Sequence, residues 1–346
     1  MLEVNNIPFY KDTNLLFKRI PHTDKLHILD PTVIEKVKKS GFILETDISQ
    51  DNQSIDALAL RQTMGSPNND ITSTPIKIET RLIPLKDRQI PIRIFKPNTP
   101  TSHMIIFIHG GGYIGGSSCV STNPCKYLCE CAQAMVVSID YRLAPEAPFP
   151  AAYNDCKEVT QWLLGHLELW QIDSKHVAIC GESAGGALAL AISATELGKS
   201  IALTIPIYAA LDVNNNKQLN YWSYDHYPVI ETQKDYMKTR LNRFILLNDL
   251  MVHLYAYHVH DYCDERLSPL YTKHLQNISH VLLIEAEYDY YRLSNDQFAK
   301  RLIDHHIPCT LVRYQGMDHG FFDRIGTCVQ TKDCIETIAL YFQQLL

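Results

Sequence analysis

Ser183 lies in the segment Gly181-Glu182-Ser183-Ala184-Gly185, a G-x-S-x-G pattern. The segment follows the short apolar run Val177 to Cys180 and precedes a stretch of small, helix-forming residues, Ala187 to Ala191. In a strand–turn–helix setting, the flanking glycines permit a tight turn that lifts the serine hydroxyl above the sheet. Outside such a setting, the same pattern would often be an ordinary glycine turn. Here the setting predicts that Ser183 is a nucleophile.

A second chemical signal is the segment His109-Gly110-Gly111-Gly112, which directly follows an apolar run. Glycines let the backbone approach a substrate and point N–H groups at the negative oxygen that develops during acyl transfer. We expect the N–H groups of Gly111, Gly112 and Ala184 to form such an oxyanion hole. Alone, three consecutive glycines could form only a flexible loop. We expect His109 to hold this loop through hydrogen bonds rather than to act as a base.

Both segments belong to a series of short apolar runs separated by helix-length stretches. Runs with little alternation are typical of parallel strands that are buried on both faces and joined by crossover helices. The alternating residues Ile76 to Leu82, a polar turn, and Ile90 to Phe95 instead predict a β-hairpin. The sequence therefore predicts an α/β fold with a mostly parallel, doubly wound sheet. The predicted core strands are 104–108, 135–139, 177–180, 201–207, 281–284 and 310–312.

Two parts of the chain fall outside this alternation. Residues 1 to about 60 have helical rather than strand periodicity, for example in Leu15 to Ile20. Residues 211–264 contain a cluster of aromatic side chains and a helical stretch from Leu241 to Leu254, and they are too many for a simple connection. We expect a single domain, 1–346, in which about 1–60 and 211–264 form a helical cap over the sheet.

Four motifs together resemble those of the hormone-sensitive-lipase family of esterases, and the match runs in order from about residue 76 to the C-terminus. Within this family, the chain looks most similar to bacterial acetyl esterases. Membership implies the α/β-hydrolase fold, a Ser-Asp-His triad in that chain order, an oxyanion hole from the glycine loop, and no cofactor. The motifs are His109–Gly112, Asp140–Glu146 with Phe149–Ala152, Gly181–Gly186 and Asp318–Phe321.

The residues themselves point to the same base and acid. Among the histidines after Ser183, His319 stands out because it follows a predicted strand and sits in a glycine-containing loop. The expected cap contains His226, His253, His258 and His260, and a predicted helix end contains His305 and His306. Asp289 follows an earlier predicted strand, and its carboxylate would fix the tautomer of His319 and stabilise the imidazolium. The residues after Asp289 depart from the family pattern. Glu285 and Glu287 therefore remain alternative acids.

Composition narrows the classes of partner. The chain has 346 residues, 46% of them hydrophobic, and a net charge of −6 without a run of basic residues, which argues against nucleic acid as a partner. No stretch approaches the ~18 apolar residues of a membrane span, and the first residues lack a signal-peptide pattern. The 10 cysteines include several in apolar segments, and the group Cys119 to Cys131 lacks paired C-x-x-C spacing. We expect a cytoplasmic protein without a membrane span or metal, whose clustered thiols lie on a helix.

The leading prediction is hydrolysis of a short-chain acyl ester, a small-molecule substrate, through an acyl-enzyme intermediate. An acyltransferase could use the same triad, because fold and triad do not fix the substrate. A non-catalytic small-molecule receptor is a third hypothesis, since some plant hormone receptors resemble this family but lack the catalytic histidine. His319 is present here. The sequence leaves the physiological ester and the oligomeric state open.

Overall fold

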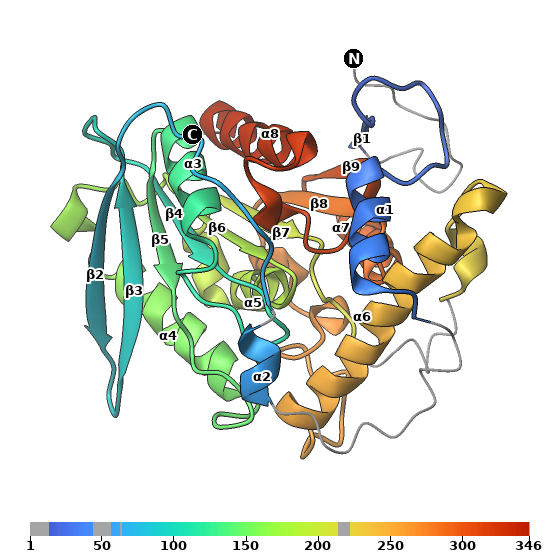
Figure 1. Cartoon of the computed structure of the whole chain (residues 1–346). Helices are drawn as coiled ribbons and strands as arrows, with labels where there is room; N and C mark the ends of the chain where they lie inside the picture. Colours follow the sequence, from blue (N-terminus) through green and yellow to red (C-terminus); the bar gives the residue numbers. More distant parts are fainter. Residues whose placement is uncertain (1–13, 44–56, 63, 214–221, 346) are drawn as a thin grey trace.

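One sheet of nine strands forms the centre of the molecule in the computed structural model, which describes residues 14–43, 57–62, 64–213 and 222–345 (Figure 1). The strand order is β1-β9-β8-β7-β6-β4-β5-β3-β2. The strands are β1 (Asn14–Lys18), β2 (Lys77–Pro84), β3 (Gln89–Lys96), β4 (Met104–Ile108), β5 (Met135–Ile139), β6 (Val177–Glu182), β7 (Leu203–Ile207), β8 (Val281–Tyr288) and β9 (Cys309–Asp318).

The sheet has the predicted mixture of strand directions. β2 and β3 pair antiparallel, as the predicted hairpin requires, and β3 also runs antiparallel to β5. The remaining neighbours are parallel. Every residue of β4, β5, β6 and β7 is buried, which explains why these strands show continuous apolar runs instead of alternation. The predicted mostly parallel α/β fold is confirmed.

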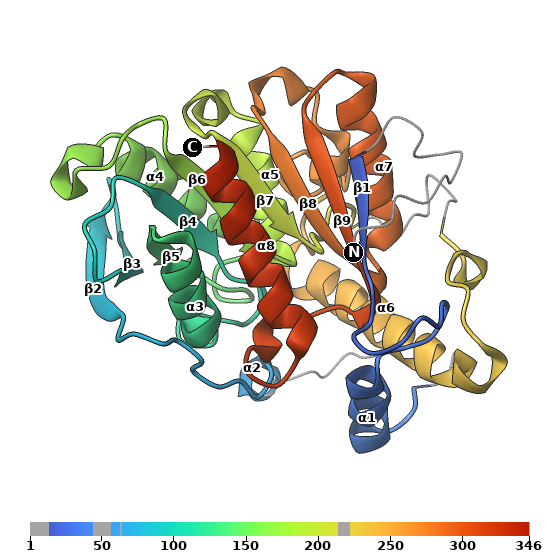
Figure 2. The same ribbon diagram turned by 90° about the horizontal axis from the view of Figure 1, so that it is seen from above.

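Helices cover both faces of this sheet. The α-helices of the described residues are α1 (Pro31–Ser40), α2 (Ala57–Gln62), α3 (Thr122–Ala132), α4 (Ala151–Leu164), α5 (Ala184–Ser193), α6 (Lys234–Tyr255), α7 (Arg292–Asp304) and α8 (Val329–Leu345). Short 3₁₀ helices lie at Leu167–Trp170, Glu196–Ser200, Tyr224–His226, Glu231–Gln233, Pro269–Tyr271, Leu275–Asn277 and Phe322–Arg324. α3 and α8 pack together on one face of the sheet, and α4, α5 and α7 cover the other (Figures 1 and 2).

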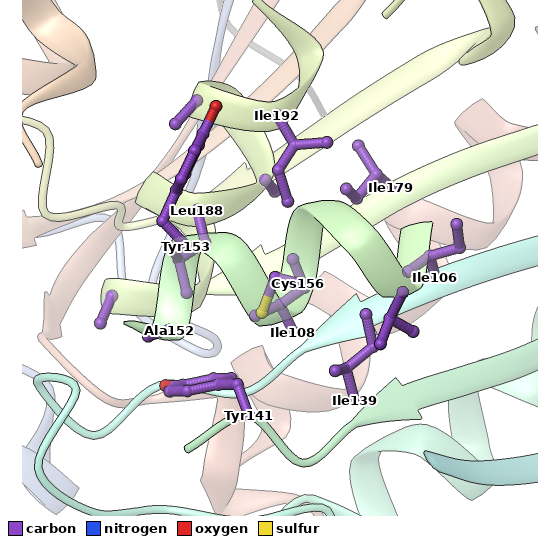
Figure 3. Close-up of a cluster of buried hydrophobic side chains, with 14 of the residues drawn as sticks. Ile106, Ile108, Ile139, Tyr141, Ala152, Tyr153, Cys156, Ile179, Leu188 and Ile192 are labelled. Carbon is purple, nitrogen blue, oxygen red and sulfur yellow. The ribbon is translucent and has the colours of Figure 1, made fainter. Parts of the chain in front are cut away.

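The layer between the sheet and helices α4 and α5 is densely apolar. Each isoleucine or leucine side chain that is fully buried there stabilises the fold by ~1.5–3 kcal/mol relative to an exposed one. This packing fixes the strands relative to one another, and it thereby fixes the loops that leave their ends. Figure 3 shows the core side chains Ile106, Ile108, Ile139 and Ile179 from the strands with Cys156, Leu188 and Ile192 from the two helices.

One prediction for the N-terminal part of the chain is wrong. Residues 15–18 lie in strand β1, not in a helix, and β1 pairs in parallel with β9 at the edge of the sheet. Leu15, Leu16 and Phe17 are all buried. A short apolar run does not by itself distinguish a helix from a buried strand. The partner that decides the matter, β9, lies almost 300 residues later, so no local pattern reveals it.

α1 and α6 pack against each other at the end of the sheet where the parallel strands finish, and α2 lies at the same end (Figures 1 and 2). These helices belong to the two parts of the chain predicted to form a cap, and they are helical as predicted. α6 begins at Lys234, earlier than the predicted Leu241. The predicted cap residues 1–13, 44–56 and 214–221 lie outside the described residues. Within the described part of the chain, no helix is long and apolar enough to span a bilayer.

Candidate active site

The register of the sheet brings four strand ends together. The last residue of β4 pairs with Gly181 of β6, so the glycine loop after β4 lies beside the turn after β6. Tyr288, which ends β8, pairs with Asp318, which ends β9, so the next residues, Asp289 and His319, leave the sheet side by side. Only β7 separates β6 from β8. All four loops therefore meet at the carboxyl edge of the sheet, where open α/β sheets bind ligands.

Ser183 occupies the sharp turn between β6 and α5. Its φ of 56° and ψ of −121° are unfavourable for a residue with a side chain, so the surroundings must enforce them. The Ser183 N–H donates to the carbonyl of Ile207 at 2.9 Å, and the Ser183 carbonyl accepts from the N–H of Ala187. A Cβ at Gly185 would collide with the carbonyl of Ile108. The turn has the strand–turn–helix arrangement predicted from the sequence.

His319 connects Ser183 to Asp289. Its Nε2 lies 2.8 Å from Ser183 Oγ, and its Nδ1 lies 2.7 Å from Asp289 Oδ2. An ionised carboxylate only accepts hydrogen bonds, so Nδ1–H donates to Asp289, and Nε2 is left to accept from the serine hydroxyl. The exposed fractions are 9% for Ser183, 4% for His319 and 1% for Asp289. This arrangement can move a proton from the serine to the imidazole.

The loop that carries Asp289 departs from the family pattern, yet it holds this side chain firmly. Asp289 Oδ1 accepts from the Tyr291 N–H at 2.8 Å, and the Asp289 carbonyl accepts from the Tyr227 hydroxyl at 2.9 Å. The Tyr291 hydroxyl in turn donates to Asn248 Oδ1 on α6 at 2.9 Å. Tyr291 of this loop and Tyr227, which precedes α6 in the chain, therefore orient Asp289, and Tyr291 ties the loop to α6.

The two alternative acids point elsewhere. Glu285 is buried and pairs with the Arg313 guanidinium, while Glu287 Oε2 accepts from the Gly316 N–H at 2.8 Å. Burial raises the pKa of Glu285 to about 8 and also raises the pKa of Glu287. Of the three carboxylates considered from the sequence, the structure places Asp289 at the imidazole of His319.

The glycine loop presents backbone N–H groups to the same site. Gly111 and Gly112 have φ values of 114° and 60°, and both line the cavity that contains Ser183. Neither of their N–H groups donates a hydrogen bond to a described residue. Ala184 is the first residue of α5, where the N–H groups have no acceptor within the helix. These three groups, and the positive end of the α5 dipole, can stabilise a negative oxygen next to Ser183.

His109 and Glu182 fix the position of the glycine loop. His109 Nδ1 lies 2.7 Å from the Gly110 carbonyl, and the His109 carbonyl accepts from the Tyr141 hydroxyl at 3.0 Å. Glu182, next to the nucleophile, accepts from the Gly110 N–H at 2.5 Å. Burial lowers the pKa of His109 and raises that of Glu182. The expected structural role of His109 agrees with these contacts, whereas no role was predicted for Glu182.

A cavity of about 420 Å³ lies over Ser183 and His319, between the sheet edge and helices α1 and α6. Its volume lies within the ~300–1,000 Å³ that is typical of small-molecule pockets, so it can hold a small ester. Its lining residues are Lys36, Ile43, Met64, Gly65, Ser66, Gly111, Gly112, Glu182, Ser183, Arg240, Arg243, Phe244, Leu246, Leu247, Leu250, His319, Gly320 and Asp323.

Comparison with known proteins identifies the family. A family model described as the α/β hydrolase fold matches residues 105–323, which is more than half of the chain. An arylesterase from Saccharolobus solfataricus is 30% identical over 244 residues, which cover 69% of this chain and 75% of the relative. The chain belongs to the α/β-hydrolase fold family.

Other relatives of this hydrolase agree with that placement. An ethyl acetate hydrolase from Pseudomonas putida is 27% identical over 253 residues, which cover 70% of this chain and 74% of that protein. The solved structure of a hyperthermophilic esterase from the archaeon Pyrobaculum calidifontis superposes with a TM-score of 0.73 at 23% identity, covering 92% of this chain and 99% of the other. The predicted family and fold are confirmed, and the protein is a carboxylic ester hydrolase.

Several residues of the hydrolase cavity were not predicted from the sequence. α6 contributes Arg240, Phe244 and Leu247, and the Phe244 ring centroid lies 4.3 Å from that of His319. α1 contributes Lys36. The spacing of three and four residues along α6 is a signal for one helix face. The sequence does not show that this face points at the nucleophile, because that depends on how α6 packs across the sheet edge.

Three of the four clustered cysteines, Cys125, Cys129 and Cys131, lie on α3 as predicted, whereas the prediction is wrong for Cys119, which is exposed in the turn before this helix. Cys125 and Cys129 are buried on α3, and burial raises the pKa of Cys129 to about 12. Cys180 is buried in β6 as a small core residue, while Cys309 in β9 is only partly buried. In the residues that the structure describes, no group of three or more His, Cys, Asp or Glu side chains is placed to bind a metal.

Proposed function

We propose that this hydrolase cleaves esters of short-chain carboxylic acids through an acyl-enzyme intermediate. Ser183 is the nucleophile, His319 the general base and Asp289 the residue that orients the base. The observation that carries this assignment is the continuous pair of buried hydrogen bonds through His319, 2.8 Å to Ser183 Oγ and 2.7 Å to Asp289 Oδ2. The proposed chemistry uses side chains and backbone groups alone, with no cofactor or metal.

The reaction has two halves. In the first, Ser183 Oγ attacks the carbonyl carbon of the ester while His319 Nε2 takes the hydroxyl proton. The bond between this carbon and the ester oxygen then breaks, and His319 returns the proton to the departing alcohol. In the second half, His319 removes a proton from water, the hydroxide attacks the acyl carbon, and Ser183 leaves with the proton. The products are the alcohol and the carboxylic acid.

The oxyanion hole consists of the N–H groups of Gly111, Gly112 and Ala184. The carbonyl oxygen of the ester becomes negative in each tetrahedral intermediate, and donors that are already oriented stabilise it without reorganisation. Asp289 contributes separately: it holds His319 with the proton on Nδ1 and stabilises the imidazolium that forms during the attack.

The short acyl preference is supported by the dimensions of the cavity and by the residues that close it. Phe244, Leu247 and Leu250 of α6 line the 420 Å³ cavity together with the nucleophile. Extra methylenes of a long acyl chain would meet these side chains instead of open space. The relative from Pseudomonas putida, an ethyl acetate hydrolase, supports the same class of acid.

We propose further that α1, α2 and α6 are parts of a cap, formed by about 1–60 and 211–264 without strand β1, on a single domain, 1–346. The position of α1 and α6 at the carboxyl edge of the sheet supports this division. We also propose that the protein works in a reducing compartment such as the cytoplasm, because all ten cysteines are free thiols.

Turnover of p-nitrophenyl acetate by wild type and Ser183→Ala tests the proposed mechanism. Ser183→Ala should lose essentially all turnover. Ser66→Ala is the matched control, because Ser66 lines the same cavity but has no hydrogen bond with His319 in the described structure. Full turnover by Ser183→Ala would show that the nucleophile has been assigned wrongly.

A further inference from the structure

Basic side chains gather at one end of the cavity. Lys36 comes from α1, and Arg240 and Arg243 come from successive turns of α6. α1 and α6 pack against each other, so residues far apart in the sequence share one wall. Arg240 is buried, Lys36 is partly buried, and Arg243 is exposed at the rim. The nucleophile Ser183 lines the same cavity.

The protein itself uses only part of this positive charge. Asp318 lies between two arginines, with Oδ2 2.5 Å from Arg240 Nε and Oδ1 2.5 Å from an Arg324 guanidinium nitrogen. Lys36 and Arg243, in contrast, form no hydrogen bond or ion pair with any residue that the structure describes. Two cations of the cavity therefore remain available to a ligand.

The acidic groups nearby do not cancel this excess. Asp323 lines the cavity with Glu182, but burial raises the pKa of Asp323 to about 6 and that of Glu182 well above its usual range. Even when Asp318 and Asp323 are both ionised, three arginines and Lys36 face two carboxylates.

The surroundings of Lys36 and Arg243 disfavour the charged forms of these side chains. Burial, reinforced by the neighbouring Arg324, lowers the pKa of Lys36 to about 7, and burial together with Arg240 lowers the pKa of Arg243. An anion bound between them would offset both effects, because an opposite charge within a few ångströms favours the protonated amine. The gain from an anionic ligand is larger at Lys36, which is partly buried, than at Arg243, which is exposed at the rim.

The other end of the cavity is apolar. Leu247 and Leu250 follow Arg240 and Arg243 along the same face of α6, and Met64 joins them. Phe244 stands between the two ends, with its ring centroid 4.3 Å from that of His319 and 5.4 Å from the Arg240 guanidinium carbon. The basic end thus begins one side chain away from the base.

We propose that the substrate of this esterase is an ester that carries a free carboxylate, bound by Lys36 and Arg243 beside the Arg240–Asp318 pair. The inference rests on the proposed function and names its substrate class. Two kinds of ester share the required chemistry. In the half-ester of a dicarboxylic acid, the carboxylate belongs to the acyl part, and in an O-acetyl hydroxy acid it belongs to the alcohol part.

Matched pairs of substrates test the proposal. Monomethyl glutarate is compared with its primary amide, in which –CONH₂ replaces the carboxylate, and acetoxyacetate is compared with acetoxyacetamide. In at least one pair, kcat/KM should be about tenfold or more higher for the carboxylate, since hydrogen bonds between charged groups are roughly twice as strong as neutral ones. The pair that shows the preference identifies which side of the ester carries the anion.

Variants locate the preference. Lys36→Met and Arg243→Met should each lower the ratio of carboxylate to amide turnover, and Lys36→Arg should keep most of it because the charge remains. Lys38→Met is the matched control, because Lys38 is an exposed lysine on the same helix that does not line the cavity. A misfolded variant would lose turnover of both members of a pair, whereas the proposal concerns their ratio.

Binding gives a readout that does not depend on turnover. Calorimetric titration of Ser183→Ala with monomethyl glutarate, acetoxyacetate and their amides should show tighter binding of a carboxylate, and the added Lys36→Met change should remove the difference. If wild type cleaves neutral short esters and neither assay shows a preference, this inference is overturned while the proposed function stands. If no ester is cleaved, the proposed function fails, and the titration alone supports or overturns the anion site.

Discussion

Replacing Asp289 with asparagine removes one negative charge while it preserves the size of the side chain. In the structure, this carboxylate accepts from His319 Nδ1 at 2.7 Å and is only 1% exposed. An asparagine can turn its NH₂ group toward the imidazole and so favour the tautomer with the proton on Nε2, which cannot accept the proton of Ser183. The imidazolium of the transition state also loses its buried counter-charge.

The expected effect falls on the chemical step. The same exchange in a serine-protease triad lowers kcat about 10⁴-fold. We expect Asp289→Asn to lower kcat by ~10³–10⁴-fold, equal to ~4–5.5 kcal/mol of transition-state stabilisation. KM should change little, because Asp289 does not line the cavity.

Initial rates with p-nitrophenyl acetate near neutral pH measure both constants. Glu287→Gln is the matched control. Glu287 lies in β8, two residues before Asp289, but its carboxylate accepts a hydrogen bond from the Gly316 N–H instead of from His319. Its kcat should stay close to that of wild type. The assignment of the acid would be refuted by near-normal kcat in Asp289→Asn together with a large loss in Glu287→Gln.

Three further predictions concern the base, the acyl group and a buried ion cluster. His319→Ala should lower kcat about as much as Ser183→Ala, because members of a triad act as a unit. Near-normal kcat in His319→Ala would contradict this role. Across acetate, butyrate, octanoate and palmitate esters of one alcohol, kept below micelle formation, kcat/KM should peak at about two to four acyl carbons, and a maximum at octanoate or beyond would refute the short-chain preference. Asp318→Asn should lower the free energy of unfolding by ~3–5 kcal/mol in urea titrations, because Arg240 and Arg324 would be buried without a counter-charge, and an unchanged value would count against this. Burial opposes ionisation of Asp318, but Arg240 and Arg324 hold its pKa well below the usual range. Its contribution to stability is therefore present above the unfolded-state pKa and lost as pH falls through the folded-state pKa.

The core of the fold is predictable because each of its strands can be recognised from a short local sequence pattern. Strands such as β4 and β5 are buried on both faces, so each appears as a short apolar run between helices. The turn at Ser183 is predictable for a similar reason, since its glycines are required by close backbone contacts. Chain order then points to Asp289 and His319, and the pairing of Tyr288 with Asp318 explains why they meet.

The features that sequence analysis missed depend on contacts between distant parts of the chain. β1 was predicted as a helix because only its pairing with β9 shows that Leu15 to Phe17 belong to the sheet. The basic end of the cavity was missed because it combines Lys36 of α1 with Arg240 and Arg243 of α6. Each of these residues is ordinary in its own helix. Their place in the cavity depends on the packing of α1 and α6 over the nucleophile.

Covalent labelling tests the central claim most directly. A fluorophosphonate that forms a stable adduct with an activated serine should add one label per chain to wild type, and ester hydrolysis should disappear in proportion to the label. Peptide mapping by mass spectrometry should place the label on Ser183, and Ser183→Ala should remain unlabelled. A label on another residue that abolishes activity, with Ser183 unmodified, would contradict the account.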